Sequence, residues 1–536
     1  MCGIVILLQG PEDGGNRVKA ALDRISHRGP DASSVLVLAR HGRHFVGHNR
    51  LSIQGQHLTE PQPIVRDGCV LSANAEIYNA ETLTASEDPV SDCDAILDAL
   101  KGCETVQAYV HALQKLDGIF SFVLVKTNEV IFARSRFGIM PLFVGRDGDG
   151  LVLCSERKCF PGLHLDVVLP GTFAVVPLQN PTDYKLHLFD AKLSEQPAAR
   201  ECLSEATFRQ LFFAAVEKRL RTIADGVDFG FLLSGGLDSS AVVAAARHLH
   251  PKLKIKTFCI GLPGSPDMEA ARLVAQHLGT DHHEYVFTVA EGLSAVPAVV
   301  RALETVDTTT VRAGTPMWLL GQHIHQDFPD LKVLFSGEGA DELLMGYLCF
   351  HEGESLEALQ EYSLYLLDRL HQFDVQRAHF ALIAHSIETR VPFLDRDFVD
   401  YCLDLHPAFK APTCRQEKYW LRRMVKDLLP PTIVKRVKEQ FSDGVGYAWI
   451  DALRDGAWCD WDDTKEEDRG AKEQDLQRYK KATGREQLNV FHLFETQLGA
   501  KAFEDACKSM HTWKPGFGGC EDPSGRVAAV HPDRLI

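Results

Sequence analysis

The sequence lacks several features that would assign it to a well-defined class of protein. None of its 14 cysteines belongs to a Cys-x-x-Cys pair, so the spacing predicts neither a zinc site nor a disulfide scaffold, and reduced thiols in a cytoplasmic enzyme are the simpler account. No apolar run approaches the ~18 residues that a membrane-spanning helix requires. Residues 1–8 are apolar, but no basic residue precedes them and two acidic residues soon follow. We therefore predict a strand there rather than a signal peptide.

The chain also lacks an excess of positive charge. Its net charge of −16 argues against non-specific binding to nucleic acid, although it leaves room for small anions in a local pocket. The 536 residues are too many for one hydrophobic core, so we expect two or three domains.

The pattern of apolar residues changes along the chain. Residues 1–190 carry short apolar runs separated by Gly, Pro, Asp and Asn, which predicts a β-rich domain. A polar, proline-bearing linker is expected at 191–202. From residue 203 helical and strand patterns alternate, which predicts a parallel sheet covered by helices. Beyond about residue 356 the pattern is mainly helical up to 514, and the Gly- and Pro-containing end at 515–536 is expected to be a poorly ordered tail.

The segment Phe231–Ser240 reads Phe-Leu-Leu-Ser-Gly-Gly-Leu-Asp-Ser-Ser. It joins an apolar run typical of a buried strand to a stretch with helix-forming composition. A strand that turns through glycines into a helix directs several backbone N–H groups at one point, which suits a phosphate. A lone Gly-Gly would be more simply an ordinary turn. The combination Ser-Gly-Gly-x-Asp-Ser is more restrictive, and because no Gly-Lys-Ser/Thr follows it is not a Walker loop. It resembles the pyrophosphate loop of the ATP pyrophosphatases.

Cys2 is the first residue with chemical potential. A penultimate cysteine means little by itself, but removal of Met1 would leave a thiol and a free α-amine on one residue. The amine, with a pKa near ~8, can take the thiol proton without a histidine. Three further motifs follow, His-Arg-Gly-Pro-Asp at 27–31, Arg-Leu-Ser at 50–52 and Asn-Ala-Glu-Ile-Tyr-Asn at 74–79. In this order they resemble the class II glutamine amidotransferases, in which an N-terminal cysteine hydrolyses glutamine to ammonia.

This resemblance implies roles that no single residue would suggest, since each alone is more simply a surface arginine, a turn asparagine or a helix-start aspartate. Arg50, with Leu51 and Ser52 beside it, would clamp the α-carboxylate of glutamine. Glu76 and Asp92 would receive its α-amine. Asn74 and the backbone N–H of Ala75 would form the oxyanion hole.

Further motifs follow in the second half, at 309–312, 336–343, 390–395, 417–418 and 438–446. Together with the Cys2 half they resemble the glutamine-dependent asparagine synthetases, over residues 1 to about 450. Amidotransferases that act on sugar phosphates or phosphoribosyl pyrophosphate share only the first half. The implied fold is an α+β N-terminal nucleophile glutaminase, an αββα sandwich, followed by an α/β parallel-sheet ATP pyrophosphatase domain (203–514) with a helical C-terminal part.

The resemblance also implies the reaction. The β-carboxylate of aspartate attacks the α-phosphorus of ATP and expels pyrophosphate, and ammonia then attacks the β-aspartyl-AMP. Glu338 would be the general base and, with Cys2, Asn74 and Arg312, one of the catalytic residues. Thr309 and Arg312 would hold aspartate, and Asp238 and Asp341 would hold Mg²⁺. The ATP-binding residues would be Leu233, Ser234, Gly235, Gly236, Asp238, Ser239, Ser240, Ile260, Ser336, Gly337 and Lys438.

The chain departs from the family pattern at three places. Ala75 stands where glycine is usual, and an N–H donated from a conformation with positive φ would cost alanine ~1 kcal/mol or more. Ser135 and Met140 replace an aspartate and an arginine, which could weaken coupling between the domains. His385-Ser386 replaces a pair that ends in glycine, for which the sequence offers no physical account.

Three alternatives stay open at this point. The protein could be an ammonia-dependent synthetase with an impaired glutaminase, a relative that adenylates another acid, as in the cyclases that form β-lactams, or a non-catalytic binding protein. Retention of Cys2 argues against the second, and retention of Asp238, Glu338 and Lys438 against the third. The expected partners are glutamine, aspartate and ATP, with neither nucleic acid nor membrane. The oligomeric state is open, with a homodimer as one candidate.

Overall fold

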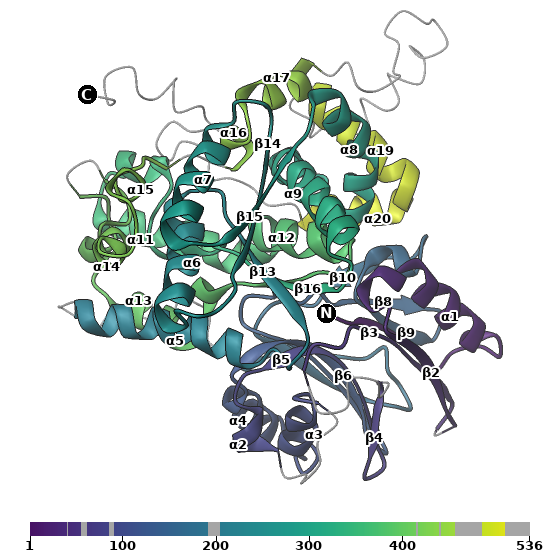
Figure 1. Ribbon diagram of the computed structural model, residues 1–536. Coiled ribbons are helices and arrows are strands. Elements are labelled where there is room, and N and C mark those ends of the chain that lie inside the picture. Colours follow the sequence, from purple (N-terminus) through teal and green to yellow (C-terminus); the bar gives the residue numbers. More distant parts are fainter. Residues whose placement is uncertain are drawn as a thin grey trace, which may run out of the picture.

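The protein is described by a computed structural model that covers residues 1–39, 41–54, 62–84, 91–190, 204–413, 416–438, 441–455 and 485–509. The chain forms an N-terminal part, drawn in purple and blue in Figure 1, and a larger C-terminal part in teal, green and yellow. The predicted linker at 191–202 lies outside the described residues, as does the predicted tail at 515–536. The limits of the domains therefore stay a prediction.

Two antiparallel sheets form the centre of the N-terminal part. The first has the order β10 (Leu165–Val167), β8 (Phe143–Asp147), β9 (Gly150–Cys154), β1 (Gly3–Leu8), β3 (Arg43–Arg50), β2 (Ala32–Ala39). The second has the order β12 (His187–Leu188), β11 (Thr172–Pro177), β7 (Glu129–Arg134), β6 (Gly118–Val125), β5 (Cys69–Ile77), β4 (Ile64–Arg66). The helices of this part are α1 (Gly14–Arg24), α2 (Ala80–Leu83), α3 (Asp94–Leu100) and α4 (Val106–Lys115).

The alternation of side chains along β1 explains why these elements form layers. Val5 and Leu7 pack in one apolar cluster with Val18 and Leu22 of α1. Ile4, Ile6 and Leu8 point the other way and pack with Val123, Val125 and Phe132 of the second sheet. The outer face of that sheet packs against α3 and α4. Successive strand residues face opposite sides of a sheet, so each sheet packs against helices on one face and against the other sheet on its second face. This layer order confirms the predicted αββα sandwich.

A five-stranded parallel sheet forms the centre of the C-terminal part. Its order is β15 (Asp281–Val286), β14 (Lys256–Gly261), β13 (Asp228–Leu232), β16 (Leu331–Phe335), β17 (Glu388–Arg390). Figure 1 shows helices on both of its faces, with α6 and α7 on one side and α8 and α9 on the other. The predicted parallel sheet is confirmed.

The helices of this part follow the chain in the order α5 (Glu205–Arg221), α6 (Leu237–Leu249), α7 (Pro266–Leu278), α8 (Val289–Leu303), α9 (Thr308–Asp327), α10 (Ala340–Leu343), α11 (Leu356–Arg369), α12 (Asp374–Ile383), α13 (Arg396–Asp404), α14 (Tyr419–Val425), α15 (Pro431–Val434), α16 (Phe441–Gly444), α17 (Tyr447–Asp455), α19 (Arg485–Leu498) and α20 (Ala500–Ser509). Past residue 356 the described structure is helical as predicted, with one consequential exception. The short strand β17 completes the sheet and faces the N-terminal part.

Ser386 gives a physical reason for one departure from the family pattern. Its φ is +63°, in the left-handed region that normally favours glycine. Its hydroxyl donates a hydrogen bond to the backbone carbonyl of His27, 2.8 Å away in the N-terminal part. The serine thus joins the two parts of the structure at a position where glycine would only relieve backbone strain.

Met140 is fully buried where the two parts meet. It belongs to one apolar cluster that includes Met1, Leu51 and Ile139 from the N-terminal part and Leu233 from the C-terminal part. Figure 1 shows the N-terminus at this junction. An apolar seam therefore connects the neighbourhood of Cys2 with the strand that precedes Ser234.

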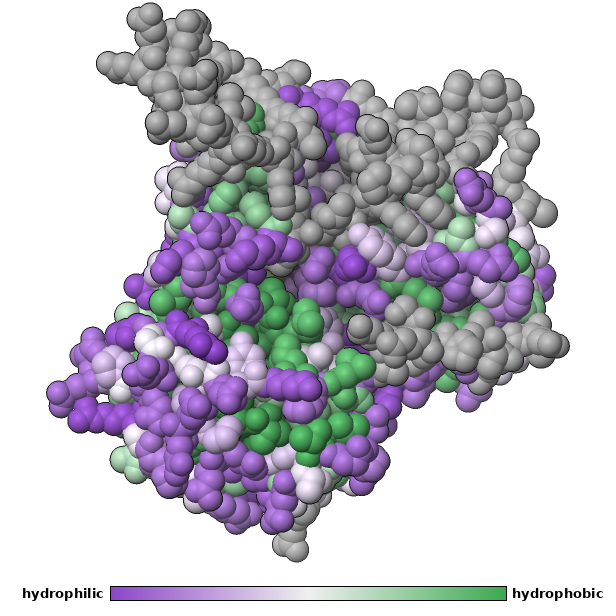
Figure 2. Space-filling model, turned by 180° about the vertical axis from the view of Figure 1, so that it is seen from behind, coloured by the Kyte–Doolittle hydropathy of each residue, from purple (hydrophilic) through white to green (hydrophobic). Residues whose placement is uncertain are grey.

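The outer surface is more hydrophilic than the junction between the two parts. Seen from behind, hydrophilic side chains cover much of the described surface, with hydrophobic areas gathered on the lower part (Figure 2). Among the described residues, no helix combines the length and apolarity that a membrane crossing needs.

Candidate active sites

Cys2 lies at the start of β1 and is buried. Its backbone N–H donates to Oδ1 of Asn74 at 2.9 Å, and its thiol lies 3.9 Å from the backbone carbonyl oxygen of Leu51. Burial raises the pKa of the thiol above its ordinary value. Such a thiol needs a base to become a nucleophile, and the α-amine that removal of Met1 would create lies on the same residue.

Two buried donors next to Cys2 have no hydrogen-bond partner in the described part of the chain. They are Nδ2 of Asn74 and Nη1 of Arg50. Unpaired buried donors are costly and call for a ligand or water. Their chemistry matches the predicted roles, since the Asn74 amide can stabilise an oxyanion and the Arg50 guanidinium can bind a carboxylate.

Ala75 lies in the middle of β5, opposite Phe120 of β6. It is absent from the residues with positive φ. The conformational penalty that would have impaired an alanine at this position therefore does not arise, and the glycine of the family pattern is not required here for backbone reasons.

The predicted receptors of the glutamine α-amine form a group of acidic side chains. Oε2 of Glu76 accepts from Nη2 of Arg390 at 2.6 Å, and Oδ2 of Asp92 accepts from the backbone N–H of Ile77 at 2.6 Å. Burial is the largest influence on both carboxyls, raising the pKa of Glu76 well above its usual range and that of Asp92 to about 7. An arriving ammonium group would offset this penalty by pairing with the carboxylates.

Arg390 reaches this group from β17, in the C-terminal part. Its Nε donates to Glu388 at 2.8 Å and its Nη1 to Oγ1 of Thr222 at 2.9 Å and to the backbone carbonyl of Arg219. Glu388 also lies 3.3 Å from the N-terminal ammonium of Met1. The predicted glutamine site is therefore built from both parts of the structure.

Ser234, Gly235 and Gly236 form the turn between β13 and α6, as the sequence predicted. Gly235 has φ +71°, and a Cβ there would lie 2.3 Å from the backbone nitrogen of Ala271 in α7. The Ser239 hydroxyl lies 3.2 Å from that of Ser234. Gly236 precedes α6 and has no side chain to cap it. The first N–H groups of this 13-residue helix are thus left for an anion.

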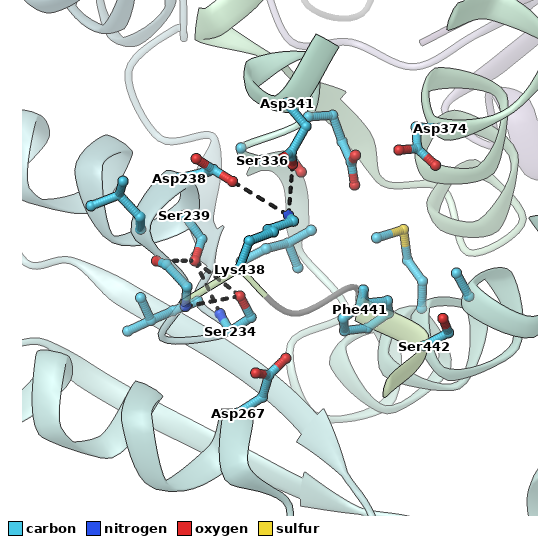
Figure 3. A pocket seen from close by; sticks show the side chains of 18 of the residues that line it. Ser234, Asp238, Ser239, Asp267, Ser336, Asp341, Asp374, Lys438, Phe441 and Ser442 are labelled. Atoms are coloured by element: carbon cyan, nitrogen blue, oxygen red, sulfur yellow. Dashed lines mark hydrogen bonds and ion pairs between the residues drawn. The ribbon is translucent and has the colours of Figure 1, made fainter. Parts of the chain in front are cut away.

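This turn forms one wall of a cavity at the C-terminal ends of the strands, shown in Figure 3. Most of the residues predicted to bind ATP line it, together with Thr309, Glu338 and Asp341: Leu233, Ser234, Gly236, Asp238, Ser239, Ile260, Ser336, Gly337 and Lys438. Gly337 lies close to the turn, since a Cβ there would be 2.9 Å from the backbone nitrogen of Ser239. Gly235 and Ser240, also predicted to bind ATP, are not among the residues that line it.

Two lysines neutralise the two aspartates of the cavity. Nζ of Lys418 lies 2.6 Å from Asp238 and 2.6 Å from Asp341, and Nζ of Lys438 lies 2.6 Å from Asp341 and 3.6 Å from Asp238. Figure 3 shows Lys438 between the two carboxylates. Burial opposes ionisation of Asp341, but both lysines outweigh it and lower the pKa of its carboxyl to about 2.

These carboxylates fit the predicted Mg²⁺. Mg²⁺ binds to proteins through one or two carboxylates and takes its other ligands from water and phosphate oxygens. The carboxylates of Asp238 and Asp341 already pair with positive charge, that of the lysine ammonium groups. Among the described residues no group of three or more metal-ligating side chains occurs.

Glu338 faces the same cavity. It accepts a hydrogen bond from Nη2 of Arg377 at 2.7 Å, and Arg377 also pairs with Asp374. Burial has the largest effect on Glu338 and raises the pKa of its carboxyl despite Arg377. A carboxylate with a raised pKa is a stronger base, as the predicted role requires.

Arg312 is not among the residues that line the cavity, unlike most of the other residues predicted for this site. It lies on α9, where Thr309 lines the cavity, but its guanidinium makes two hydrogen bonds to Glu486 of α19. Its role toward aspartate stays a prediction.

Sequence reasoning missed several residues of these sites. Lys418 and Arg390 were parts of motifs without an assigned role, and Arg377, Asp374 and Glu388 were not singled out. Gly346 leaves the space that Lys418 occupies, because a Cβ at residue 346 would lie 1.8 Å from Cε of Lys418. This relation between the two residues is visible only in the folded structure.

Two different families match the N-terminal and the C-terminal parts of the chain. Residues 1–168 match the family described as glutamine amidotransferase domain. Residues 207–361 and 352–474 match the family described as asparagine synthase.

Curated relatives extend over most of the chain. Glutamine-hydrolysing asparagine synthetase 2 of Lotus japonicus is 37% identical over 501 residues, which cover 85% of this chain and 80% of that protein. That of Triphysaria versicolor is 39% identical over 487 residues, with coverage of 85% and 80%. A probable glutamine-hydrolysing asparagine synthetase of Dictyostelium discoideum is 33% identical over 589 aligned positions and covers 99% of both chains.

The raised pKa of Asp92 predicts how glutamine use depends on pH. Below pH 7 its carboxyl is largely protonated and cannot pair with the glutamine ammonium, so the KM for glutamine should fall as pH rises from 6 to 8. Steady-state glutamine hydrolysis across this range measures the effect. The Asp92→Asn variant should have a higher KM and a flatter profile, and an unchanged slope in that variant would refute the assignment.

Arg390 predicts a dependence of glutamine binding on the C-terminal part. Arg390→Gln leaves Glu76 buried without its cation, so the KM for glutamine should rise by about 10-fold or more, which corresponds to ~1.4 kcal/mol, while Arg390→Lys should recover part of the loss. The matched control is Arg396→Gln, because Arg396 also reaches across to the N-terminal part, where it donates a hydrogen bond to the backbone carbonyl of Gln114 rather than to a carboxylate. Equal glutamine KM values in all three variants would contradict this role.

Proposed function

The chain belongs to the family of glutamine-hydrolysing asparagine synthetases, and on that premise we propose how its two sites divide the reaction. The protein is an ATP-dependent carbon–nitrogen ligase that forms asparagine from aspartate with glutamine as the nitrogen donor. One observation supports this division of the reaction between two sites. The structure contains two separate polar sites, one around Cys2 and one around Ser234–Ser240, and a buried apolar seam connects them.

At the first site Cys2 attacks the side-chain amide carbon of glutamine. The new C–S bond forms as the α-amine of Cys2, free once Met1 is removed, takes the thiol proton. Arg50 holds the α-carboxylate, and Glu76 with Asp92 the α-ammonium. Nδ2 of Asn74, a buried donor, faces the oxyanion. As the tetrahedral intermediate collapses, the α-ammonium of Cys2 returns its proton to the leaving nitrogen, the C–N bond breaks and ammonia departs. Water then hydrolyses the thioester and releases glutamate and the free thiol.

At the second site the β-carboxylate of aspartate displaces pyrophosphate from ATP. The N–H groups at the start of α6 and the hydroxyls of Ser234 and Ser239 bind the departing pyrophosphate. Lys418 and Lys438 neutralise phosphate charge, and Asp238 with Asp341 would hold Mg²⁺, which would screen the phosphate oxygens. The role of this chain is chiefly to position the reactants and to balance their charge.

Ammonia then attacks the acyl carbon of β-aspartyl-AMP. Glu338 takes the proton that the attacking nitrogen loses, and AMP leaves. The apolar seam around Met140 supports a route for neutral ammonia between the sites, because ammonium would be poorly solvated there.

Three broader statements remain proposals. We expect a cytoplasmic enzyme, a view that the free thiols of the described cysteines favour. A homodimer stays a candidate assembly. Of the alternatives, an impaired glutaminase is not favoured, since the backbone of Ala75 is unstrained.

The Cys2→Ala variant tests the division of labour. With amide-¹⁵N-labelled glutamine, Mg-ATP and aspartate it should form no labelled asparagine, whereas added ammonium should restore asparagine and AMP in equal amounts. Cys103→Ala, another buried cysteine of the same domain, should transfer the label normally. Loss of the ammonium-dependent reaction in Cys2→Ala would refute the two-site account.

Glu338→Gln tests the general base. Asparagine formation should fall by about 10²-fold or more with either nitrogen source, the usual range for loss of such a group. Glutamine hydrolysis and aspartate-dependent release of pyrophosphate should persist, because neither needs this carboxylate. Asparagine formation at the normal rate would remove Glu338 from the mechanism.

A further inference from the structure

The contact between Arg312 and Glu486 lies outside the reaction just described. Nε of Arg312 donates to Oε1 of Glu486 at 2.8 Å, and Nη2 donates to Oε2 at 2.6 Å. The two side chains are 7% and 9% exposed. This is a two-point, charge-assisted pair in a nearly dry position, which is the strongest arrangement that an arginine and a carboxylate form.

The position of Arg312 on α9 makes this pair consequential. Thr309, Ala313 and Met317, on the same helix, line the nucleotide cavity, whereas Arg312 does not. Residue 312 lies three positions after Thr309 and directly before Ala313, so its Cα is on the flank of the same helix face. The guanidinium is therefore close to the cavity in the chain but is directed to α19.

The partner that directs it away is a carboxylate, the same group that an amino-acid substrate carries. A guanidinium has one Nε–Nη2 edge, and Glu486 occupies that edge in full. A substrate carboxylate that needs the same edge must displace Glu486.

The helix that carries Glu486, α19, is followed by α20, which contacts the N-terminal part of the structure. α19 packs against α8, α9 and α17, and α20 returns along it. At the far end Asp505 of α20 accepts from the backbone N–H of Leu165 at 2.8 Å and lies 3.2 Å from Nδ1 of His164. Both contacts are on or next to β10. The pair α19–α20 thus runs from Arg312 to the glutaminase sandwich, and it lies beyond residue 474, where the match to the asparagine synthase family ends.

We propose that α19–α20 is a strap whose Glu486 competes with substrate aspartate for Arg312. With the strap docked, Arg312 is held out of the cavity and aspartate binds weakly. When aspartate takes the guanidinium, Glu486 is released and the strap loosens along its length, up to the contact of Asp505 with β10. The proposal rests on the proposed role of Arg312 in aspartate binding.

The test uses the full-length enzyme with ammonium as nitrogen donor, so that glutamine hydrolysis does not enter the measurement. Glu486→Gln keeps the shape of the side chain but removes its charge, so the KM for aspartate should fall about 10-fold with kcat little changed. Asp505→Asn weakens only the contact of the strap with β10, so this variant should lower the KM for aspartate less than Glu486→Gln does. Glutamine hydrolysis and thermal unfolding of each variant establish that it is folded.

Hydrogen exchange provides a readout that does not depend on turnover. Saturating aspartate should speed exchange in residues 485–509 of the wild type and should have little effect in Glu486→Gln, where the strap is already loose. Glutamine alone should leave this segment unchanged.

The outcomes separate the strap from the role of Arg312. If Arg312→Gln leaves the aspartate KM unchanged, Arg312 does not bind aspartate and the strap proposal falls with that assignment. If Arg312→Gln raises the KM and Glu486→Gln raises it too, Glu486 positions Arg312 and the competition is refuted. An unchanged KM in Glu486→Gln likewise refutes it while leaving the role of Arg312 intact.

Discussion

The buried guanidinium of Arg390 connects the two halves of the protein at the predicted glutamine site. Burying a cation is costly unless it is paired and hydrogen-bonded. The partners of Arg390 come from β17, from the end of α5 and, through Glu76, from β5 of the other half. The backbone of the same residue accepts from the N–H of Ser336, at the wall of the nucleotide cavity. One residue therefore links both sites.

The two sites handle charge in opposite ways. The predicted glutamine site gathers carboxylates around one arginine, and their pKa values are raised chiefly by burial and further by the neighbouring carboxylates. The nucleotide site is already balanced, because Lys418 and Lys438 face Asp238 and Asp341. At the first site the ammonium group of the ligand would supply the missing positive charge. At the second site the lysines would have to exchange their ion pairs with the aspartates for ion pairs with the phosphate groups of the ligand.

Local patterns in the sequence were sufficient for the glycine turn at Ser234–Gly236, for a β-rich first part and for the parallel sheet, because these depend on nearby residues and on the alternation of side chains. The αββα arrangement and most of the residues that line the cavity came instead from the family resemblance. The strand β17 was missed because three residues carry no period. The partners of Arg390 and Arg312 lie far away in the sequence, at Glu76 and Glu486, and pairs of this kind appear only when the chain is folded.

The arrangement of Lys418 and Lys438 has a consequence for turnover. Once phosphate groups have drawn both ammonium groups away from the aspartates, the carboxylates remain nearby as competing partners. Each lysine can return to Asp238 or Asp341 as pyrophosphate departs, so no bare charge is left behind and the product does not have to be pulled from an unneutralised cation. A cavity that carries its own counter-ions would bind a nucleotide less tightly, and release it sooner, than a cavity with unpaired cations.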